Sequence, residues 1–318
     1  MNLLTTVPAD PASNAPLAGP RSLVLPGGEH GVLLFHGLSS TPAELQFLAR
    51  GLQRAGFTVR VPVIDGYSFG TTGPREHARW AQAALAAFEA LRAECRTVAV
   101  GGLCIGAVLA LGVAAQRSTE AAAVLALSTT LHYDGWAAPW TRRFLGLGAW
   151  WPLTALAARI GVRESAPFGV KDERMRGWIA AQMQNTGHSD AGSAILTVRD
   201  LIEARRLIDG VRRRLPVIAT PTLLVHARED DAASPRSAFE VAQRISARDV
   251  RCVVLGDSYH MVSIDREKHR VLSEMKDFLQ KQTGQVGGES QVLAENRTRF
   301  DRQDRLDDGR ALASRRTL

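Results

Sequence analysis

The sequence predicts an α/β fold, a doubly wound and mostly parallel sheet that carries a helical insertion. Short apolar runs alternate with amphipathic stretches along most of the 318-residue chain. One run leads into a glycine-flanked turn with a central cysteine, at 102–106, and a helical stretch follows at once. The alternation is interrupted between residues 131 and 215 by a helical stretch that is rich in tryptophan. Alternating strands and helices are typical of a parallel sheet that is covered on both faces.

The elements follow from this pattern in chain order. The predicted strands are the apolar runs near 31–35, 57–61, 97–101, 122–128, 222–226 and 249–255. The predicted helices are the amphipathic stretches near 42–55, 75–93, 105–117, 234–247 and 265–282.

The ends of the chain and the interruption define its predicted organisation. Residues 1–20 are rich in Pro and Ala and are predicted to form a flexible arm. Residues 283–318 are polar, with mixed charges and no apolar periodicity, and are predicted to be disordered. Between them we expect a core of residues 21–130 and 216–282, with residues 131–215 as the insertion.

Composition limits the class of protein. Three cysteines give no disulfide framework, which favours a reducing, cytoplasmic location. The N-terminus does not resemble a secretory signal, and no run approaches the ~18 apolar residues of a membrane span. The net charge of +7 fits a basic solvated surface, or attraction to an acidic partner such as an anionic membrane surface or the phosphates of CoA. No basic stripe is interleaved with aromatic residues, so nothing indicates nucleic-acid binding.

The turn at 102–106 is the most specific signal in the chain. It reads Gly-Leu-Cys-Ile-Gly between a predicted strand and a predicted helix. This is the G-x-S-x-G nucleophile elbow with Cys104 in the place of serine. Small residues are needed on both sides because the turn is strained and the helix packs close to the strand. The structural alternative is a buried cysteine in an ordinary strand–helix turn.

Three further segments support the elbow. Residues 36–42 follow a strand and read His-Gly-Leu-Ser-Ser-Thr-Pro, residues 227–235 read Ala-Arg-Glu-Asp-Asp-Ala-Ala-Ser-Pro, and residues 258–260 read Ser-Tyr-His. The order nucleophile, acid, histidine is that of α/β-hydrolases. Over residues 20–282 the sequence resembles that superfamily, and most closely its bacterial carboxylesterase and monoacylglycerol-lipase-like branch. The resemblance implies the α/β-hydrolase fold with a helical cap over the active site.

The resemblance also implies roles for individual residues. Cys104 matches the nucleophile, His260 the general base and acid, and Asp230 the group that orients the histidine. The backbone N–H groups of Leu38 and Ile105 match the oxyanion hole, which needs two fixed donors. No metal or cofactor is implied.

Neighbouring residues offer alternatives to these assignments. Asp231 is a rival acid, although the motif favours the residue before it. Asp257 lies three residues before the histidine and is expected to shape the turn. His36 matches the family's loop residue, so we expect it to stabilise the loop and not to act as a base.

The insertion contains five of the six tryptophans. In the resembling branch an insertion at this place forms a roof over the substrate. We therefore expect a lipophilic acyl pocket, the alternative being that these rings only pack the cap onto the core. The predicted substrate contacts are Trp136, Trp140, Trp150 and Trp151.

The sequence thus indicates a hydrolase that cleaves small-molecule acyl esters or thioesters, free or bound to CoA or a carrier protein, through a covalent acyl-enzyme. A first alternative is an acyltransferase that passes an acyl group from a thioester to an alcohol or amine. A second is a non-catalytic binding module on the same fold. Two origins of Cys104 stay open, a natural nucleophile or a Ser→Cys replacement that traps an intermediate. The oligomeric state is not predicted.

Overall fold

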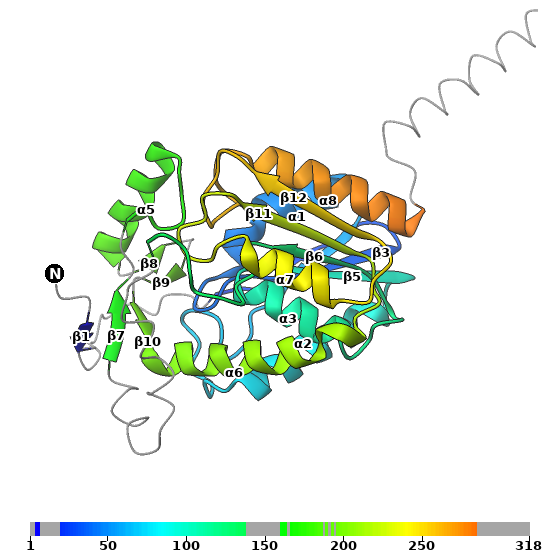
Figure 1. Cartoon of the computed structure of the whole chain (residues 1–318), viewed down its shortest axis with the longest axis horizontal. Helices are drawn as coiled ribbons and strands as arrows, with labels where there is room; N and C mark the ends of the chain where they lie inside the picture. Colours follow the sequence, from blue (N-terminus) through cyan, green and yellow to red (C-terminus); the bar gives the residue numbers. More distant parts are fainter. Residues whose placement is uncertain are drawn as a thin grey trace, which may run out of the picture.

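The computed structural model describes residues 4–6, 20–137, 160–163, 166–186, 188–189, 192–193 and 195–284. At its centre is a seven-stranded sheet between helices (Figure 1). In spatial order the strands are β12 (Val250–Leu255), β11 (Thr222–Ala227), β6 (Ala121–Leu127), β5 (Thr97–Leu103), β3 (His30–Phe35), β4 (Thr58–Val61) and β2 (Leu23–Leu25). Every neighbouring pair is parallel except β2 and β4. The predicted doubly wound, mostly parallel sheet is confirmed.

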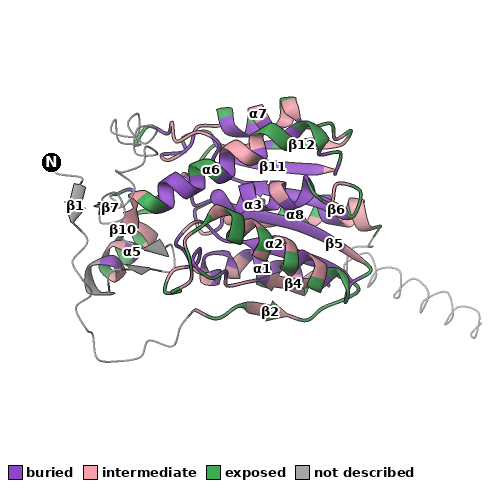
Figure 2. Cartoon of the chain, turned by 90° about the horizontal axis from the view of Figure 1, so that it is seen from below, coloured by how far each residue is buried: buried purple, intermediate pink, exposed green. Residues whose placement is uncertain are grey.

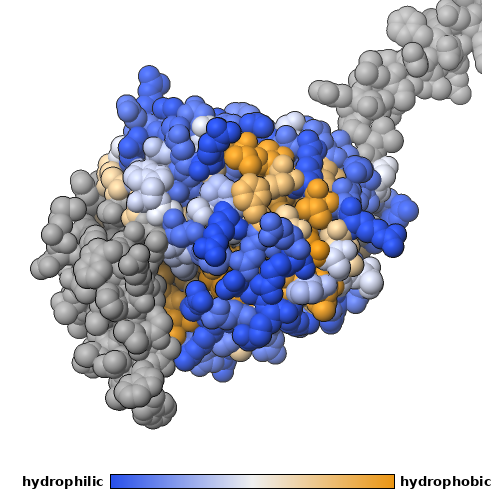
Figure 3. Space-filling view, in the orientation of Figure 1, coloured by the Kyte–Doolittle hydropathy of each residue, from blue (hydrophilic) through white to orange (hydrophobic). Residues whose placement is uncertain are grey.

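Helices cover both faces of this sheet. One face carries α2 (His77–Arg92), α3 (Ile105–Ala114), α6 (Val198–Arg214) and α7 (Arg236–Arg244). The other face carries α1 (Gln46–Arg54) and α8 (Lys268–Thr283). Each layer packs an apolar cluster against the sheet, and Figure 2 shows the buried residues gathered in the strands and on the inward faces of the helices. The face seen in Figure 1 is mostly hydrophilic, with a few separate hydrophobic areas (Figure 3).

The predicted strands are all present, with ends shifted by no more than two residues. The predicted helix at 42–55 begins as a 3₁₀ turn, η1 (Pro42–Leu45), before α1. The edge strand β2 was not predicted, because three half-exposed residues carry no readable periodicity. Strand β4, which follows β3 in the chain, pairs on one side of β3, and the next strand, β5, pairs on its other side. The carboxyl ends of β3 and β5 therefore form the switch point where ligands bind in such folds.

The described part of the insertion is less purely helical than predicted. It contains α5 (Glu173–Thr186) and also β7 (Ile160–Arg163), β8 (His188–Ser189), β9 (Gly192–Ser193) and β10 (Ile195–Thr197). Strand β7 pairs antiparallel with β10 and with β1 (Leu4–Thr6), so three residues of the predicted flexible arm form a strand. Strands of two to four residues are too short for sequence periodicity to reveal. Residues 285–318 of the predicted disordered tail lie outside the described residues.

Helix α6 belongs by its packing to the body of the fold. Thr197 and Asp200 form a capping box that starts it. Along its length Leu207, Ile208 and Val211 join the apolar cluster of α2 and α3. The predicted insertion ended at residue 215, so this boundary placed a helix of the body within the cap. Among the described helices none is long and apolar enough to cross a membrane.

Candidate active site

Cys104 occupies the turn between β5 and α3. Its backbone has φ 59° and ψ −119°, a conformation that costs free energy in a residue other than glycine. A Cβ on Gly106 would lie 2.1 Å from the Phe35 carbonyl oxygen, and one on Gly102 would lie 2.4 Å from the backbone of Gly106. The two glycines therefore let α3 begin directly against β3 and β5, as the elbow pattern requires.

Two loops bring His260 and Asp230 to the same edge of the sheet, after β12 and β11. The Nδ1 atom of His260 lies 2.8 Å and 3.0 Å from the two carboxylate oxygens of Asp230. One of these oxygens also accepts the backbone N–H groups of Ala232 at 2.9 Å and Ala233 at 2.7 Å. The carboxylate is thus fixed by its own loop while it holds the imidazole ring.

The electrostatics of His260 couple it to Cys104. Burial by itself lowers the pKa of this histidine, but the Asp230 carboxylate and then the Cys104 sulfur outweigh burial and raise the pKa well above its ordinary value. The Nε2 atom is buried and makes no hydrogen bond of standard geometry with a described residue. The effect of Cys104 on this pKa indicates that the sulfur lies near the ring, whose Nε2 has no other partner among the described residues.

His226, which the sequence reasoning did not single out, lies behind Asp230. It is fully buried, and its Nε2 lies 2.7 Å from the Ala233 carbonyl oxygen and 3.2 Å from Asp230 Oδ2. Burial alone raises the pKa of Asp230, but His260 and His226 together hold it below its ordinary value. The aspartate therefore stays ionised between two histidines.

The rival acid, Asp231, faces away from the imidazole ring. Its carboxylate accepts the backbone N–H of Gly169 at 3.0 Å and that of His260 at 3.3 Å. Burial raises the pKa of Asp231. Asp257 lies at the surface, where it pairs with Lys171. Neither carboxylate contacts the ring nitrogens, and the geometry favours the aspartate that the motif indicated.

His36 holds the loop that follows β3. Its Nδ1 lies 2.7 Å from the Gly37 carbonyl oxygen, and its Nε2 lies 2.8 Å from Ser68 Oγ, which also accepts the Ile64 N–H. Burial lowers the pKa of His36 to about 4, although the bond to Gly37 opposes this. A neutral ring that donates from Nδ1 and accepts at Nε2 satisfies all three contacts. This arrangement supports a structural role for His36.

A buried glutamate stabilises the same loop. Glu44, in η1, accepts the Gly37 N–H at 2.6 Å and is 2% exposed. The next amide along the loop belongs to Leu38, and Ile105 provides the first amide of α3, which has no acceptor inside its helix. The sequence had indicated both amides but not Glu44, because a single acidic residue in a helical stretch carries no distinguishing pattern.

The hydroxyl of Thr130 contacts the Cys104 sulfur. Thr130 Oγ1 lies 3.3 Å from the sulfur and 3.2 Å from the Ser128 carbonyl oxygen. Burial raises the pKa values of Tyr67 and Tyr133, and in both the next largest cause is the charge of Cys104. No sequence signal pointed to these residues, since the fold alone brings them to the elbow.

Trp136 lies at the rim of the two loops and is 61% exposed. Its indole N–H donates to the Glu229 carbonyl oxygen at 3.0 Å, and its ring meets Tyr259 edge-on at 5.5 Å. Contact of Trp136 with substrate stays a prediction. Outside the described residues lie the other predicted substrate contacts, Trp140, Trp150 and Trp151.

Comparisons with known proteins agree with this architecture. A family model, Hydrolase_4, described as serine aminopeptidase, S33, matches residues 29–267. The chain is 22% identical over 270 residues to the thermostable monoacylglycerol lipase of Bacillus sp. (strain H-257), which covers 84% of this chain and 97% of that protein. It is 22% identical over 268 residues to a carboxylesterase of Bacillus subtilis (strain 168), with coverages of 82% and 97%.

Solved structures of lipolytic enzymes share the fold. A structure from work on the metagenome-derived lipolytic enzymes LipS and LipT has a TM-score of 0.67 at 23% identity and covers 83% of this chain and 99% of its own. The monoacylglycerol lipase of Paleococcus ferrophilus has a TM-score of 0.67 at 15% identity, with coverages of 82% and 98%. Because the family model matches more than half of the chain, the chain belongs to the Hydrolase_4 family. The likeness to the solved structures shows that it has the α/β-hydrolase fold.

Proposed function

We propose that this chain hydrolyses small acyl esters or thioesters through a covalent acyl-enzyme on Cys104. The observation that carries the proposal is the placement of this thiol on a strained turn beside a histidine that an aspartate holds. Membership of the family and likeness to lipases and a carboxylesterase support ester hydrolysis as the reaction class. The cysteine departs from the serine in the family's own description, so the thiol chemistry rests on this chain's geometry.

The first half of the reaction forms the acyl-enzyme. His260 takes the proton of the Cys104 thiol, and the thiolate attacks the carbonyl carbon of the substrate. The amides of Leu38 and Ile105 donate to the oxyanion of the tetrahedral intermediate. As the intermediate collapses, the bond to the leaving group breaks and His260 returns the proton to the departing alcohol or thiol.

The second half releases the acid. His260 takes a proton from water, and the hydroxide attacks the acyl-thioester carbon. The bond from this carbon to the Cys104 sulfur then breaks, and the sulfur regains the proton from His260. Asp230 keeps the imidazole in the tautomer that presents Nε2 and balances the positive charge that develops on the ring.

The thiol favours thioester substrates. An acyl group on Cys104 is itself a thioester, so its formation from a thioester is nearly balanced, whereas formation from an oxygen ester is uphill. Thioesters of CoA or a carrier protein therefore stay within the proposed substrate range. The same intermediate passes acyl groups readily to amines and alcohols, and this keeps acyl transfer as the competing outcome.

The test uses the full chain with p-nitrophenyl butyrate and butyryl-CoA, with product analysis in the presence and absence of 1-butanol. Cys104→Ala should lower kcat/KM at least 10³-fold, since the nucleophile is lost. Cys252→Ala, which removes an exposed thiol on β12, is the matched control and should match the parent. Butyrate as the main product supports hydrolysis, and butyl butyrate as the main product supports transfer. An alanine variant as fast as the parent would remove Cys104 from the mechanism.

A further inference from the structure

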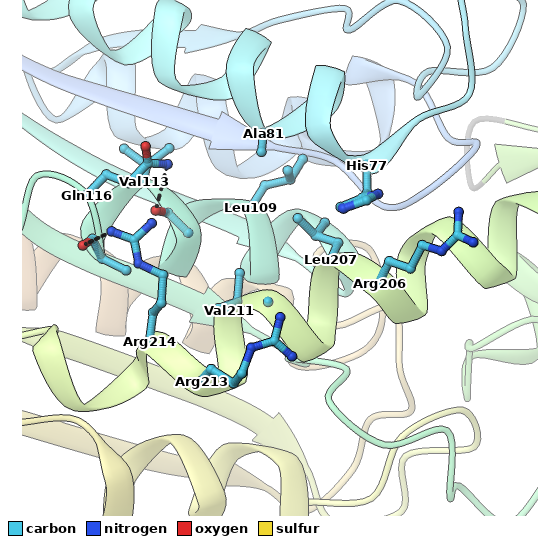
Figure 4. A pocket seen from close by; sticks show the side chains of 13 residues that line it. His77, Ala81, Leu109, Val113, Gln116, Arg206, Leu207, Val211, Arg213 and Arg214 are labelled. Atoms are coloured by element: carbon cyan, nitrogen blue, oxygen red, sulfur yellow. Dashed lines mark hydrogen bonds between the residues drawn. The ribbon is translucent and has the colours of Figure 1, made fainter. Parts of the chain in front are cut away.

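A cavity of about 320 Å³ lies between α2, α3 and α6, apart from the elbow (Figure 4). None of its lining residues is Cys104, His260 or Asp230. It opens beside the C-terminal half of α3, whereas the elbow lies at the N-terminus of that helix. Its volume falls at the small end of the range of about 300–1,000 Å³ that is typical of small-molecule sites. The cavity is therefore a second location of ligand size.

The floor of the cavity is apolar. Leu207 and Val211 of α6 face Leu109 and Val113 of α3, as Figure 4 shows, and all four side chains are otherwise buried. Ala81 of α2 adds a further small apolar group. A floor of this kind binds a hydrocarbon chain favourably, because it offers apolar surface and no hydrogen-bond partner for a polar ligand.

A glycine within α6 keeps the cavity open. A Cβ on Gly210 would have no atom within 4 Å, so close packing does not require a glycine here. Within a helix, glycine is less favourable than alanine by up to about 1 kcal/mol. Gly112 on α3 differs, because its Cβ would lie 3.3 Å from Val211. Gly210 lines the cavity, and the space beside its Cα is open.

The rim of the cavity is cationic. Arg206, Arg213, Arg214 and His77 line it, and no carboxylate does. Arg206 and His77 both pair with Glu203, and Arg214 donates to the Ala115 carbonyl oxygen. Among the described residues Arg213 makes neither an ion pair nor a hydrogen bond. A charged group without a partner above an apolar floor is suited to an amphiphilic anion.

We propose that this cavity binds a single-chain fatty carboxylate, with the hydrocarbon over Leu207 and Val211 and the carboxylate at Arg213. The apolar floor selects the chain and the cationic rim selects the head group. The cavity volume favours a chain of medium length. Each buried methylene should tighten binding by up to roughly fourfold until the cavity is filled. The proposal does not depend on the chemistry at Cys104.

Isothermal titration of the full chain with decanoate tests the site. Gly210→Leu places a side chain in the open space and improves the helix, so the fold should be kept while decanoate affinity falls at least tenfold. Arg213→Gln should weaken decanoate roughly tenfold, since a charge-assisted contact is lost. The control is Arg205→Gln on the same helix, where the arginine pairs with Asp209 outside the cavity, and this variant should bind as the parent does.

The carboxylate and the chain are tested separately with 1-decanol and acetate, both of which should bind much more weakly than decanoate. Parent-like affinity in Gly210→Leu, with an unchanged melting temperature, would overturn the proposal because the ligand then lies elsewhere. Equal binding of 1-decanol and decanoate, or loss only in the leucine variant, would overturn the assignment of the carboxylate to Arg213. Absence of binding at millimolar decanoate would overturn the whole proposal.

Discussion

Two loops carry the proposed machinery and are held from different parts of the fold: residues 36–45 after β3, the proposed oxyanion loop, and residues 256–267 after β12, the histidine loop. Each uses a buried carboxylate that accepts backbone N–H groups. Glu44 holds the Gly37 amide within its own loop, seven residues away. Asp265 accepts the Tyr259 amide at 2.7 Å and also the amides of Lys171 and Asp172 from the insertion, at 2.9 Å and 3.0 Å.

Asp231 repeats the second arrangement. It joins the amides of Gly169 and His260, and the Met261 N–H in turn donates to the Gly169 carbonyl oxygen at 2.7 Å. The position of His260 therefore depends on hydrogen bonds to the insertion, whereas the proposed oxyanion loop is supported by the body of the fold. A substitution in the insertion should therefore displace His260 more than it displaces the proposed oxyanion-hole amides.

The largest effect on activity is expected from loss of the contact between His260 and Asp230. Asp230→Asn removes the carboxylate that sets the imidazole tautomer, so kcat/KM for p-nitrophenyl butyrate should fall about 10³–10⁴-fold. Asp257→Asn on the surface of the histidine loop is the control and should stay near the parent rate. A similar small effect of both changes would show that Asp230 does not orient the ring.

The two loops should respond to pH in opposite directions. The folded protein holds the pKa of His36 at about 4, below the ordinary 6.5, so its contribution to stability is present above pH 6.5 and is lost as the pH falls toward 4. The amount is about 3 kcal/mol. The pKa of His260 is raised, so its contribution is present below pH 6.5 and is lost as the pH rises through the raised pKa.

Urea unfolding between pH 4 and pH 9 measures the loss of stability on both the acid side and the alkaline side. His36→Gln should flatten the loss of stability on the acid side, and His260→Gln should flatten the loss on the alkaline side. If either variant keeps the parent's pH profile, the corresponding histidine does not titrate as its surroundings imply.

Asp265→Asn tests the link between the histidine loop and the insertion. The asparagine N–H₂ group would face an amide N–H that the carboxylate now accepts, leaving a buried donor without a partner. We expect a loss of about 2 kcal/mol, seen as a melting temperature lower by several degrees. Proteolysis should become faster within residues 166–172. An unchanged cleavage pattern there would show that Asp265 does not hold the insertion in place.

The smallest effect is expected at the oxyanion loop. Glu44→Gln keeps an oxygen for the Gly37 amide but removes its charge, so the Leu38 amide should lose part of its alignment. We expect kcat to fall about tenfold with KM nearly unchanged, since the interaction is made in the transition state. Glu29→Gln at the surface before β3 is the control. A rise in KM alone would place Glu44 in substrate binding.

The sequence indicated the sheet and the elbow because both depend on short local patterns. The strands β3 and β11 are buried throughout, and β5 at all but its first residue, so they read as apolar runs. The glycines around Cys104 are required by close packing within five residues of the sequence. The residues that the sequence analysis did not indicate lie far from Cys104 along the chain. His226, Asp265 and Thr130 are ordinary polar residues until the fold brings them beside the site.

Helix α6 shows a further limit. The sequence predicted a helical stretch over residues 131–215 but not the surface against which this helix packs. Leu207 and Val211 are as suited to a cap as to the body, and only their packing against α2 and α3 decides between the two.

The most direct test of the account is to locate the acyl group. The full chain would be mixed with p-nitrophenyl butyrate, quenched in acid within one turnover and digested, and its peptides would be analysed by mass spectrometry. We predict one butyryl group, on Cys104, which hydroxylamine removes as it does a thioester, and no such adduct in His260→Ala within the same time. A butyryl group on a serine, or on Cys104 at equal rate without His260, would contradict the proposed mechanism.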